Sequence, residues 1–194
     1  MQPAYVFGYG SLVAMRESLE IDGEVLMPVS GWLHGSRRVW GVAMNNWEAA
    51  PSLKHFVDPE TRRAPRIRVA FLDVEEEADG AVNGLAVPVD ATRLALMDER
   101  EVNYLRVDVS SRFEPRLSCP VFAYRGSPEA RARRRAHRTD AELCVSRDYL
   151  AMVRRAFASL GPGSLAEFER TTAPLSFPLR RLELVQPGSA AADS

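Results

Sequence analysis

Residues 4–12 read Ala-Tyr-Val-Phe-Gly-Tyr-Gly-Ser-Leu, and the fold begins with this stretch. The apolar run 4–7 predicts a buried β-strand. It leads directly into a turn whose glycines, at positions 8 and 10, let the backbone bend sharply and approach a ligand closely. Successive backbone N–H groups in such a turn form a concavity that suits a carboxylate or a phosphate. The turn matches neither the P-loop nor the GxGxxG pattern, and a plain strand-to-helix turn is the alternative interpretation.

After this turn, strand patterns predominate up to residue 89. We expect a short helix near residues 14–20 and strands at 24–29 and 37–44. Residues 47–66 are rich in proline, charged and polar side chains, which predicts a long loop. Two β-branched apolar runs follow, and the acidic segment 75–80 between them predicts a β-hairpin made of 66–73 and 82–89.

The second half of the chain contains the clearest helical periodicity. Residues 90–104 predict a helix with Asp90 as its N-cap. Further helices are expected at 146–160 and 163–170, and further strands at 106–113 and 120–124.

The order of these elements predicts the fold class. Helices and strands do not alternate regularly, which favours an α+β fold with a mixed, mainly antiparallel sheet that closes into a small barrel with flanking helices. We expect residues 1–185 to form a single domain and residues 186–194 a disordered tail.

Glu101 lies on the same predicted helix face as Leu94 and Met97. A carboxylate on a core-facing stripe costs free energy unless it is paired or functional. Partial shielding from water suits a carboxyl group that acts as a general base near pH 7. The alternative is an ion pair between Glu101 and a nearby arginine, Arg100 or Arg106, at the helix end. Asp98 and Glu99 are expected to face solvent.

Two motifs together resemble those of the γ-glutamylcyclotransferase-like superfamily. They are the Tyr-Gly-Ser-Leu turn after the first strand, and a downstream helix that ends in Arg-Glu before a tyrosine and a strand. The resemblance in order and spacing covers residues 4–160. It implies that Glu101 is the catalytic glutamate and that Tyr149, on a late helix, helps to hold the substrate, although a core tyrosine is common at such a position. It also implies a substrate-binding turn made of Gly8, Tyr9, Gly10, Ser11 and Leu12.

The resemblance does not extend to glutathione specificity. Gly31-Trp32 and residues 37–40 are similar to the glutathione-specific branch. However, that branch has a longer, glycine-containing link between the glutamate and the tyrosine, and only Val102 and Asn103 intervene here. Residues 47–66 also have no evident counterpart in the family.

The reaction implied by the resemblance converts a γ-glutamyl amine or peptide to 5-oxoproline and the free amine, without a cofactor. The substrate carries its own nucleophile, the α-amine, so the enzyme must bend the chain and transfer protons. Glu101 would act as general acid and base, and the N–H groups of residues 8–12 would receive the α-carboxylate or the oxyanion. The ring of Tyr9 would be either a pocket wall or part of the core. The alternative function is a non-catalytic binding or regulatory protein that uses the same pocket for an amino-acid-like ligand.

Composition argues against several other classes. With 25 basic and 26 acidic side chains, the formal net charge of −1 favours neither a nucleic-acid nor a membrane partner. We find no run of about 20 apolar residues and no signal-peptide pattern. The only cysteines, Cys119 and Cys144, form no CxxC pair and the three histidines are scattered. We therefore expect no disulfide and no metal site, and we expect a cytoplasmic protein.

Residues 131–138 form a dense basic run. Such a run can contact nucleic acid or an anionic part of a substrate. It lacks interleaved aromatic residues in a chain that is nearly neutral, so we interpret it as a solvated loop or helix face. We interpret Cys119 and Cys144 as packing residues. The oligomeric state is left open.

Overall fold

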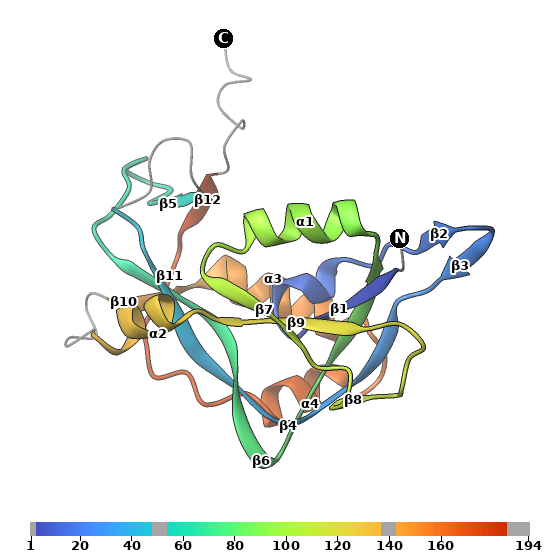
Figure 1. Ribbon diagram of the computed structural model, residues 1–194. Helices are drawn as coiled ribbons and strands as arrows, with labels where there is room; N and C mark the ends of the chain where they lie inside the picture. Colours follow the sequence, from blue (N-terminus) through green and yellow to red (C-terminus); the bar gives the residue numbers. More distant parts are fainter. Residues whose placement is uncertain (1–2, 48–53, 137–142, 186–194) are drawn as a thin grey trace.

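The computed structural model describes residues 3–47, 54–136 and 143–185. Helices pack around a strongly curled β-sheet (Figure 1). In chain order the elements are β1 (Ala4–Gly8), the 3-10 helix η1 (Ser11–Ala14), β2 (Leu19–Ile21), β3 (Glu24–Leu26), β4 (Val29–Asn45), β5 (His55–Val57), β6 (Arg68–Val89), α1 (Ala91–Arg100), β7 (Tyr104–Asp108), β8 (Phe113–Glu114), β9 (Val121–Gly126), α2 (Pro128–Arg135), β10 (Leu143–Ser146), α3 (Arg147–Ala158), α4 (Ser164–Arg170), β11 (Leu179–Arg180) and β12 (Glu183–Val185).

The main sheet is mixed and mainly antiparallel. Its strand order is β11-β10-β6-β1-β9-β7, and β4 pairs with β6 and β8. β1 runs parallel to β9, and β10 runs parallel to β6 and β11, whereas the remaining pairs are antiparallel. The sheet curls into a half-barrel, and within the described residues its edge strands β7 and β11 do not pair with each other. The predicted α+β class with a mixed sheet is confirmed, with the barrel only partly closed.

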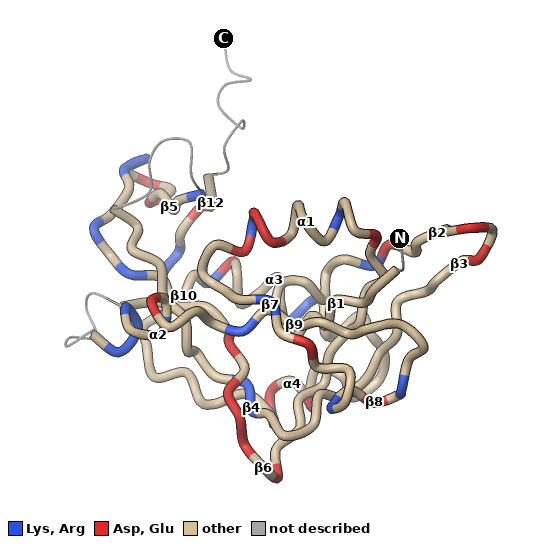
Figure 2. The backbone as a smooth tube through the Cα atoms, in the orientation of Figure 1, with Lys and Arg blue, Asp and Glu red and all other residues tan. Residues whose placement is uncertain are grey.

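β6 is 22 residues long and organises the sheet. Its first half pairs with the second half of β4, and its second half pairs with the first half of β4 and with β1. The segments 66–73 and 82–89 therefore belong to one strand, and the predicted hairpin between them is wrong. The acidic run between them, red on β6 in Figure 2, stays extended beside β4, where Arg37 forms ion pairs with Glu75 and Glu77 at 3.3 and 3.6 Å.

Two further segments differ from the predictions. Residues 14–20 do not form a helix, because η1 ends at Ala14 and β2 then pairs with β3 in a hairpin. The two residues between these strands, Asp22 and Gly23, both have positive φ, as the Asp-Gly turn of a tight hairpin requires. The predicted loop 47–66 contains β5, which pairs with β12 and buries Phe56. Residues 48–53 lie outside the described residues.

The helices agree better with the sequence. Asp90 caps α1 by accepting a hydrogen bond from the backbone N–H of Arg93 at 2.7 Å, and Ser146 caps α3. α3 and α4 match the predictions to within a few residues. α1 is shorter than predicted, so Glu101 is its C-cap residue rather than part of its last turn. The single strand predicted at 106–113 is divided into β7 and β8.

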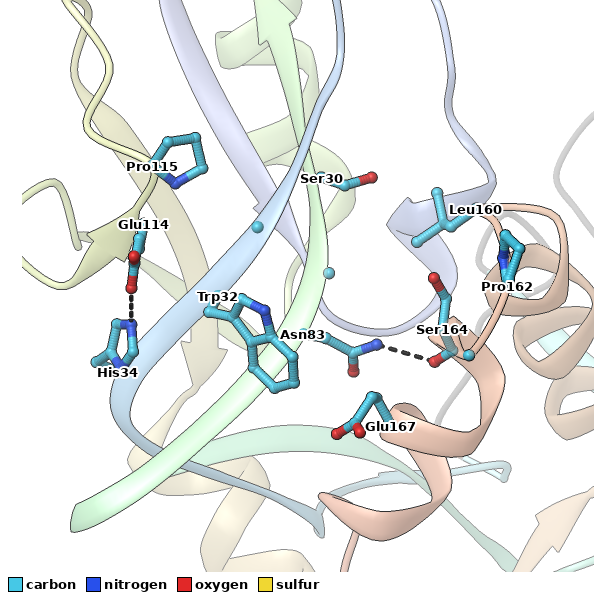
Figure 3. Close-up of a pocket in the computed structure, with 13 residues that line it drawn as sticks. Ser30, Trp32, His34, Asn83, Glu114, Pro115, Leu160, Pro162, Ser164 and Glu167 are labelled. Carbon is cyan, nitrogen blue, oxygen red and sulfur yellow. Dashed lines mark hydrogen bonds and ion pairs between the residues drawn. The ribbon is translucent and has the colours of Figure 1, made fainter.

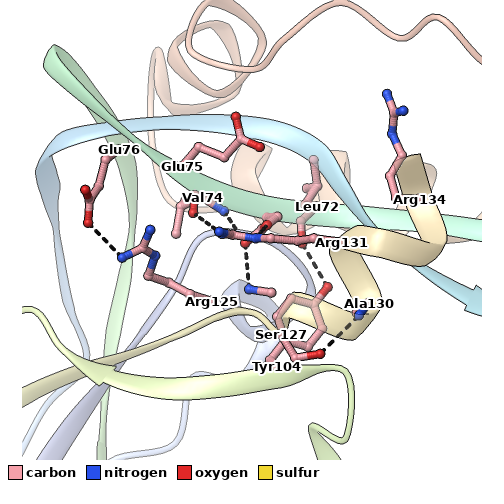
Figure 4. Close-up of polar contacts among 12 residues, drawn as sticks. Leu72, Val74, Glu75, Glu76, Tyr104, Arg125, Ser127, Ala130, Arg131 and Arg134 are labelled. Atoms are coloured by element: carbon pink, nitrogen blue, oxygen red, sulfur yellow. Dashed lines mark hydrogen bonds and ion pairs between the residues drawn. The ribbon is translucent and has the colours of Figure 1, made fainter. Parts of the chain in front are cut away.

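α2 carries the basic run, but most of its described arginines do not point into solvent. Arg133 and Arg134 each donate to a backbone carbonyl of β4 at 3.0 Å. Arg131 reaches the fully buried carboxylate of Asp73 (Figure 4). Only the last arginine of the helix, Arg135, is exposed. The interpretation as a solvated face is therefore wrong for three arginines, and residues 137–138 lie outside the described residues.

The main core lies between the concave sheet and the helices α3 and α4, and it includes Phe7, Phe113, Phe157 and Phe168. No helix in the described residues is long and apolar enough to span a membrane. The single domain over residues 1–185 stays a prediction, and the predicted disordered tail lies outside the described residues.

Candidate functional site

The turn after β1 folds back tightly on Gly8. A Cβ atom at this position would lie 2.8 Å from the Cβ of Leu12 and 2.9 Å from the backbone nitrogen of Val13, so only glycine fits. Among the described residues, the backbone N–H groups of Gly10, Ser11 and Leu12 donate to no acceptor. The turn therefore presents three neighbouring free donors that suit an anion.

A fully buried arginine, Arg38 of β4, holds the turn from inside. Its Nε donates to the carbonyl oxygen of Tyr9 at 2.8 Å, and its other N–H groups donate to Asn83 and to neutral oxygens at the end of α4. Its guanidinium lies 4.7 Å from the ring centroid of Phe168. No carboxylate pairs with Arg38 in the described part of the chain, and burial lowers its pKa to about 9. Because the peptide is trans, the N–H of Gly10 points away from the inward-facing carbonyl of Tyr9.

The Tyr9 side chain belongs to the core. The residue is 6% exposed, and its hydroxyl donates to the carbonyl oxygen of Tyr124. Burial raises the pKa of Tyr9 well above its ordinary value. The sequence left the Tyr9 ring as either a pocket wall or part of the core, and the structure places it in the core. Tyr9 therefore contributes only its backbone to the surface of the turn.

Two tyrosine hydroxyls meet beside the turn at Leu72 of β6. The hydroxyl of Tyr104 donates to the Leu72 carbonyl oxygen at 2.8 Å (Figure 4). Tyr149 is also hydrogen-bonded to the Leu72 backbone, and its hydroxyl lies 3.3 Å from where a Cβ at Gly10 would be. Burial raises the pKa of both tyrosines, so both hydroxyls stay protonated near neutral pH. Sequence reasoning identified Tyr149 but gave Tyr104 no role at the site.

Glu101 lies at the end of α1 with its side chain 19% exposed. After burial, its negative charge is a further cause that raises the pKa of Tyr9, Tyr104 and Tyr149, so the carboxylate acts electrostatically on all three hydroxyls. Its Oε1 accepts hydrogen bonds from Nε and NH2 of Arg100 at 3.2 and 3.0 Å. Its other oxygen has no partner among the described residues. Glu101 is thus shielded for the most part, and the ion pair with Arg100 that was expected as the alternative is present.

Two further acidic residues, Asp98 and Glu99, lie near Glu101 at the end of α1. Asp98 accepts hydrogen bonds from Arg106 at 2.7 Å and from the hydroxyl of Tyr124 at 2.8 Å. Arg106 therefore forms its ion pair with Asp98 and not with Glu101. Glu99 and Asp98 are both exposed, as predicted, and Asp98 makes its two contacts at the surface.

Lys54, just before β5, joins the site from a segment that the sequence predicted as loop. Its Nζ lies 5.9 Å from the ring centroid of Phe71, and Phe71 meets Tyr149 edge-to-face at 5.2 Å. The residue as a whole is exposed, yet local burial of the ammonium lowers the pKa of Lys54, and the charge of Glu101 opposes this effect. One signal in the sequence points to Lys54: it is the single lysine among the 25 basic side chains of the chain, and the other 24 are arginines.

Neither cysteine contributes to this site. Both are unpaired, and burial raises the pKa of the Cys144 thiol to about 11. A thiol with that pKa stays protonated near neutral pH and is a poor nucleophile. For Cys144 this agrees with the packing role expected from the sequence.

A separate cavity of about 820 Å³ opens between β4, β6, β8 and the start of α4 (Figure 3). Neither Glu101 nor Tyr149 lines it. Its ionisable groups are engaged with neighbours, since Glu114 pairs with His34 and Glu167 pairs with Arg170. The chemistry therefore favours the surroundings of Glu101 over this cavity as the candidate site.

No protein-family model and no curated protein matches the sequence. Among solved structures, the chain is similar to one described as a gamma-glutamyl cyclotransferase, with a TM-score of 0.49, 10% identity and 91% of each chain covered. It is also similar to an uncharacterized protein from Homo sapiens, with a TM-score of 0.49, 10% identity and coverage of 93% of this chain and 94% of that one. YkqA from Bacillus subtilis gives a TM-score of 0.43 and 14% identity, over 88% of this chain and 54% of that one.

Proposed function

We propose that the protein is a cyclotransferase of the γ-glutamylcyclotransferase type, which converts a γ-glutamyl amine or peptide to 5-oxoproline and the free amine. The observation that carries the proposal is the environment of Glu101. Its carboxylate is 19% exposed, and its charge acts on Tyr149, whose hydroxyl lies beside Gly10 of the turn. Among the described residues, the backbone N–H groups of this turn at residues 10–12 donate to no acceptor. A shielded base next to an anion cradle matches a substrate that carries an ammonium group, a carboxylate and a carbonyl that becomes an oxyanion.

In the proposed reaction, the α-amine nitrogen attacks the γ-carbonyl carbon and closes a five-membered ring. The N–H groups of residues 10–12 stabilise the oxyanion that develops on the carbonyl oxygen. When the oxyanion collapses, the bond between this carbon and the leaving nitrogen breaks. The attacking nitrogen loses two protons as it passes from ammonium to ring amide, and the leaving nitrogen gains two as it becomes an ammonium ion. Glu101 takes one proton from the attacking nitrogen and delivers one to the leaving nitrogen. The second proton of the α-ammonium is released to bulk water, and the free amine takes up its second proton from bulk water, so the protons balance and neither water nor an oxidant is consumed.

Tyr149 and Ser11 have supporting roles in this proposal. The Tyr149 hydroxyl lies over Gly10, where it would contact the γ-glutamyl group held by the turn. The Ser11 hydroxyl makes no hydrogen bond within the described residues, so it is free to contact the same group. Tyr9 and Leu12 would contribute through their backbone, because the Tyr9 hydroxyl is already bonded.

The second candidate function is non-catalytic binding of an amino-acid-like ligand, and the pair between Arg100 and Glu101 favours it. A carboxylate held by a guanidinium is stabilised as an anion, which suits recognition of a ligand ammonium. Arg100 is 54% exposed, however, and pairs with such exposure are weak. A bound substrate can therefore rearrange this pair at little cost.

The test is production of 5-oxoproline from a panel of γ-glutamyl dipeptides, γ-glutamylamines and glutathione. Glu101→Gln should retain the fold but reduce kcat roughly 10²- to 10⁴-fold, the usual range for a positioned acid–base group. Glu99→Gln, two positions away and exposed, is the matched control and should retain activity. Near-normal turnover by Glu101→Gln would remove this residue from the mechanism. Ligand binding without any 5-oxoproline would favour the non-catalytic candidate.

A further inference from the structure

Lys54 supplies a positive charge that makes no ion pair with an acidic side chain in the described part of the chain, although the charge of Glu101 acts on it. It is the single lysine among 25 basic residues. Within the described residues its ammonium forms no ion pair, and it lies instead over the apolar ring of Phe71. A compact ammonium on a flexible stem, held near an aromatic wall, is available to an anion from outside the protein.

The position of Lys54 relative to the turn indicates which part of a substrate it would meet. The Tyr149 hydroxyl lies beside Gly10, the Tyr149 ring packs on Phe71, and Lys54 lies over the Phe71 ring. Two aromatic rings thus separate Lys54 from the N–H groups that would hold the γ-glutamyl end. In Figure 1, α1 runs toward the side of the molecule that carries β5. Glu101 is the C-cap residue of α1, and Lys54 directly precedes β5. The electrostatic effect of Glu101 on Lys54 agrees with this placement.

We infer that Lys54 is a specificity-determining residue, which binds an anionic group on the amine that leaves. The inference rests on the proposed cyclotransferase function. A γ-glutamyl group in the turn directs its amide bond toward Glu101, so the leaving half extends past Tyr149 toward Phe71 and Lys54. A leaving amine with a carboxylate can then form a charge-assisted hydrogen bond with the ammonium. A leaving amine without one gains nothing from Lys54.

The first test compares two substrates that differ only in this charge, γ-glutamylalanine and γ-glutamylalaninamide. Lys54→Met keeps the apolar stem over Phe71 and removes the charge. We expect it to raise KM for γ-glutamylalanine roughly 10- to 100-fold, as the loss of one charged hydrogen bond predicts, and to leave KM for the amide within about twofold. Lys54→Arg should restore most of the difference. Arg63→Met, an exposed cation in the same segment, is the control and should change neither KM.

Equal changes in KM for both substrates would overturn the inference, because they would place Lys54 against the γ-glutamyl half or give it a general role. No change for either substrate would overturn it as well. A change confined to kcat would assign Lys54 to the chemical step instead.

The second test does not depend on turnover. Reductive ¹³C-dimethylation keeps the positive charge and labels one lysine, since Lys54 is the only one, and the α-amine signal is distinct because of its lower pKa. In the Glu101→Gln protein, γ-glutamylalanine should shift the Lys54 methyl signal and γ-glutamylalaninamide should not. If this shift occurs but the unmodified protein makes no 5-oxoproline, the proposed reaction fails while the anion contact stands. If 5-oxoproline is made but no shift occurs, the role of Lys54 fails alone.

Discussion

At the scale of single residues, Arg38 is a fully buried charge near the site, and its burial costs free energy of folding. Burial lowers its pKa from the ordinary value of an exposed arginine to about 9. Between these two values the unfolded chain binds more protons than the folded one, so the contribution of Arg38 to the free energy of unfolding rises with pH there, and its penalty is complete below pH 9. At neutral pH the burial of Arg38 therefore lowers the free energy of unfolding. We assign Arg38 a positioning role, because its hydrogen bond orients the Tyr9 carbonyl.

Arg38→Lys tests this positioning role. Lysine keeps a charge but lacks the planar fork that bonds the turn and α4 together. We expect a folded but less stable protein whose KM for a γ-glutamyl substrate rises about tenfold with a smaller effect on kcat, because one donor to the turn is worth about 1.5 kcal/mol. Arg37→Lys, on the outward face of the same strand, is the control. A lower Tm with an unchanged KM would reduce Arg38 to a structural role.

At the scale of elements, α2 is fastened to the sheet by a buried ion pair (Figure 4). Asp73 is fully buried, and its Oδ2 accepts a hydrogen bond from Nε of Arg131 at 2.7 Å. Its Oδ1 accepts from the backbone N–H groups of Val74 and Gly126, each at 2.8 Å. Asp73 directly follows Leu72, whose backbone meets Tyr104 and Tyr149. The ion pair therefore holds the stretch of β6 that assembles the site.

Breaking this pair from one side should destabilise the protein strongly. Arg131→Met leaves the Asp73 carboxylate buried without its cation, which typically costs about 3–5 kcal/mol. Arg131→Met combined with Asp73→Asn should recover part of that loss, because an amide needs no counter-charge. Urea unfolding of the two single variants and the double variant measures the coupling, with the exposed Arg135→Met as control. Additive losses would show that the two side chains act independently.

The elements that sequence reasoning predicted well are those set by local signals. Asp90 and Ser146 predict the starts of two helices, because an N-cap side chain bonds a backbone N–H within the first turn of its own helix. The β4–β6 pairing depends on contacts between distant residues, and the acidic run of β6 has the composition of a turn. Glu101 was identified from helical spacing and family resemblance. Lys54 was not predicted as a site residue, because no periodicity in the sequence links it to Glu101 and their relation depends on tertiary structure.

At the scale of the whole molecule, all five tyrosines have raised pKa values, and burial is the main cause for each. A raised folded-state pKa gives stability that is complete below the unfolded value near 10 and is lost as pH rises beyond it. Arg38 acts in the opposite direction, but it is one group against several. The free energy of unfolding should therefore fall above about pH 10.

A spectrophotometric titration tests this expectation. Phenolate absorbance of the native protein should rise together with the loss of circular dichroism, at a pH clearly above 10. In denaturant the same tyrosines should titrate near their ordinary value of about 10. Reversible ionisation of most tyrosines near pH 10, with intact circular dichroism, would contradict the burial of these hydroxyls.

The short ribbon of β5 and β12 pairs a strand from the first third of the chain with the last strand of the described chain. β5 directly follows Lys54, and its partner β12 comes after every other element. Leu182, one residue before β12, is buried in the cluster that contains Phe56 and Phe71. The wall under the Lys54 ammonium thus relies on a side chain contributed by the last turn of the fold. Under the proposed function, substitutions around Leu182 would therefore alter which leaving amines Lys54 favours without changing Glu101.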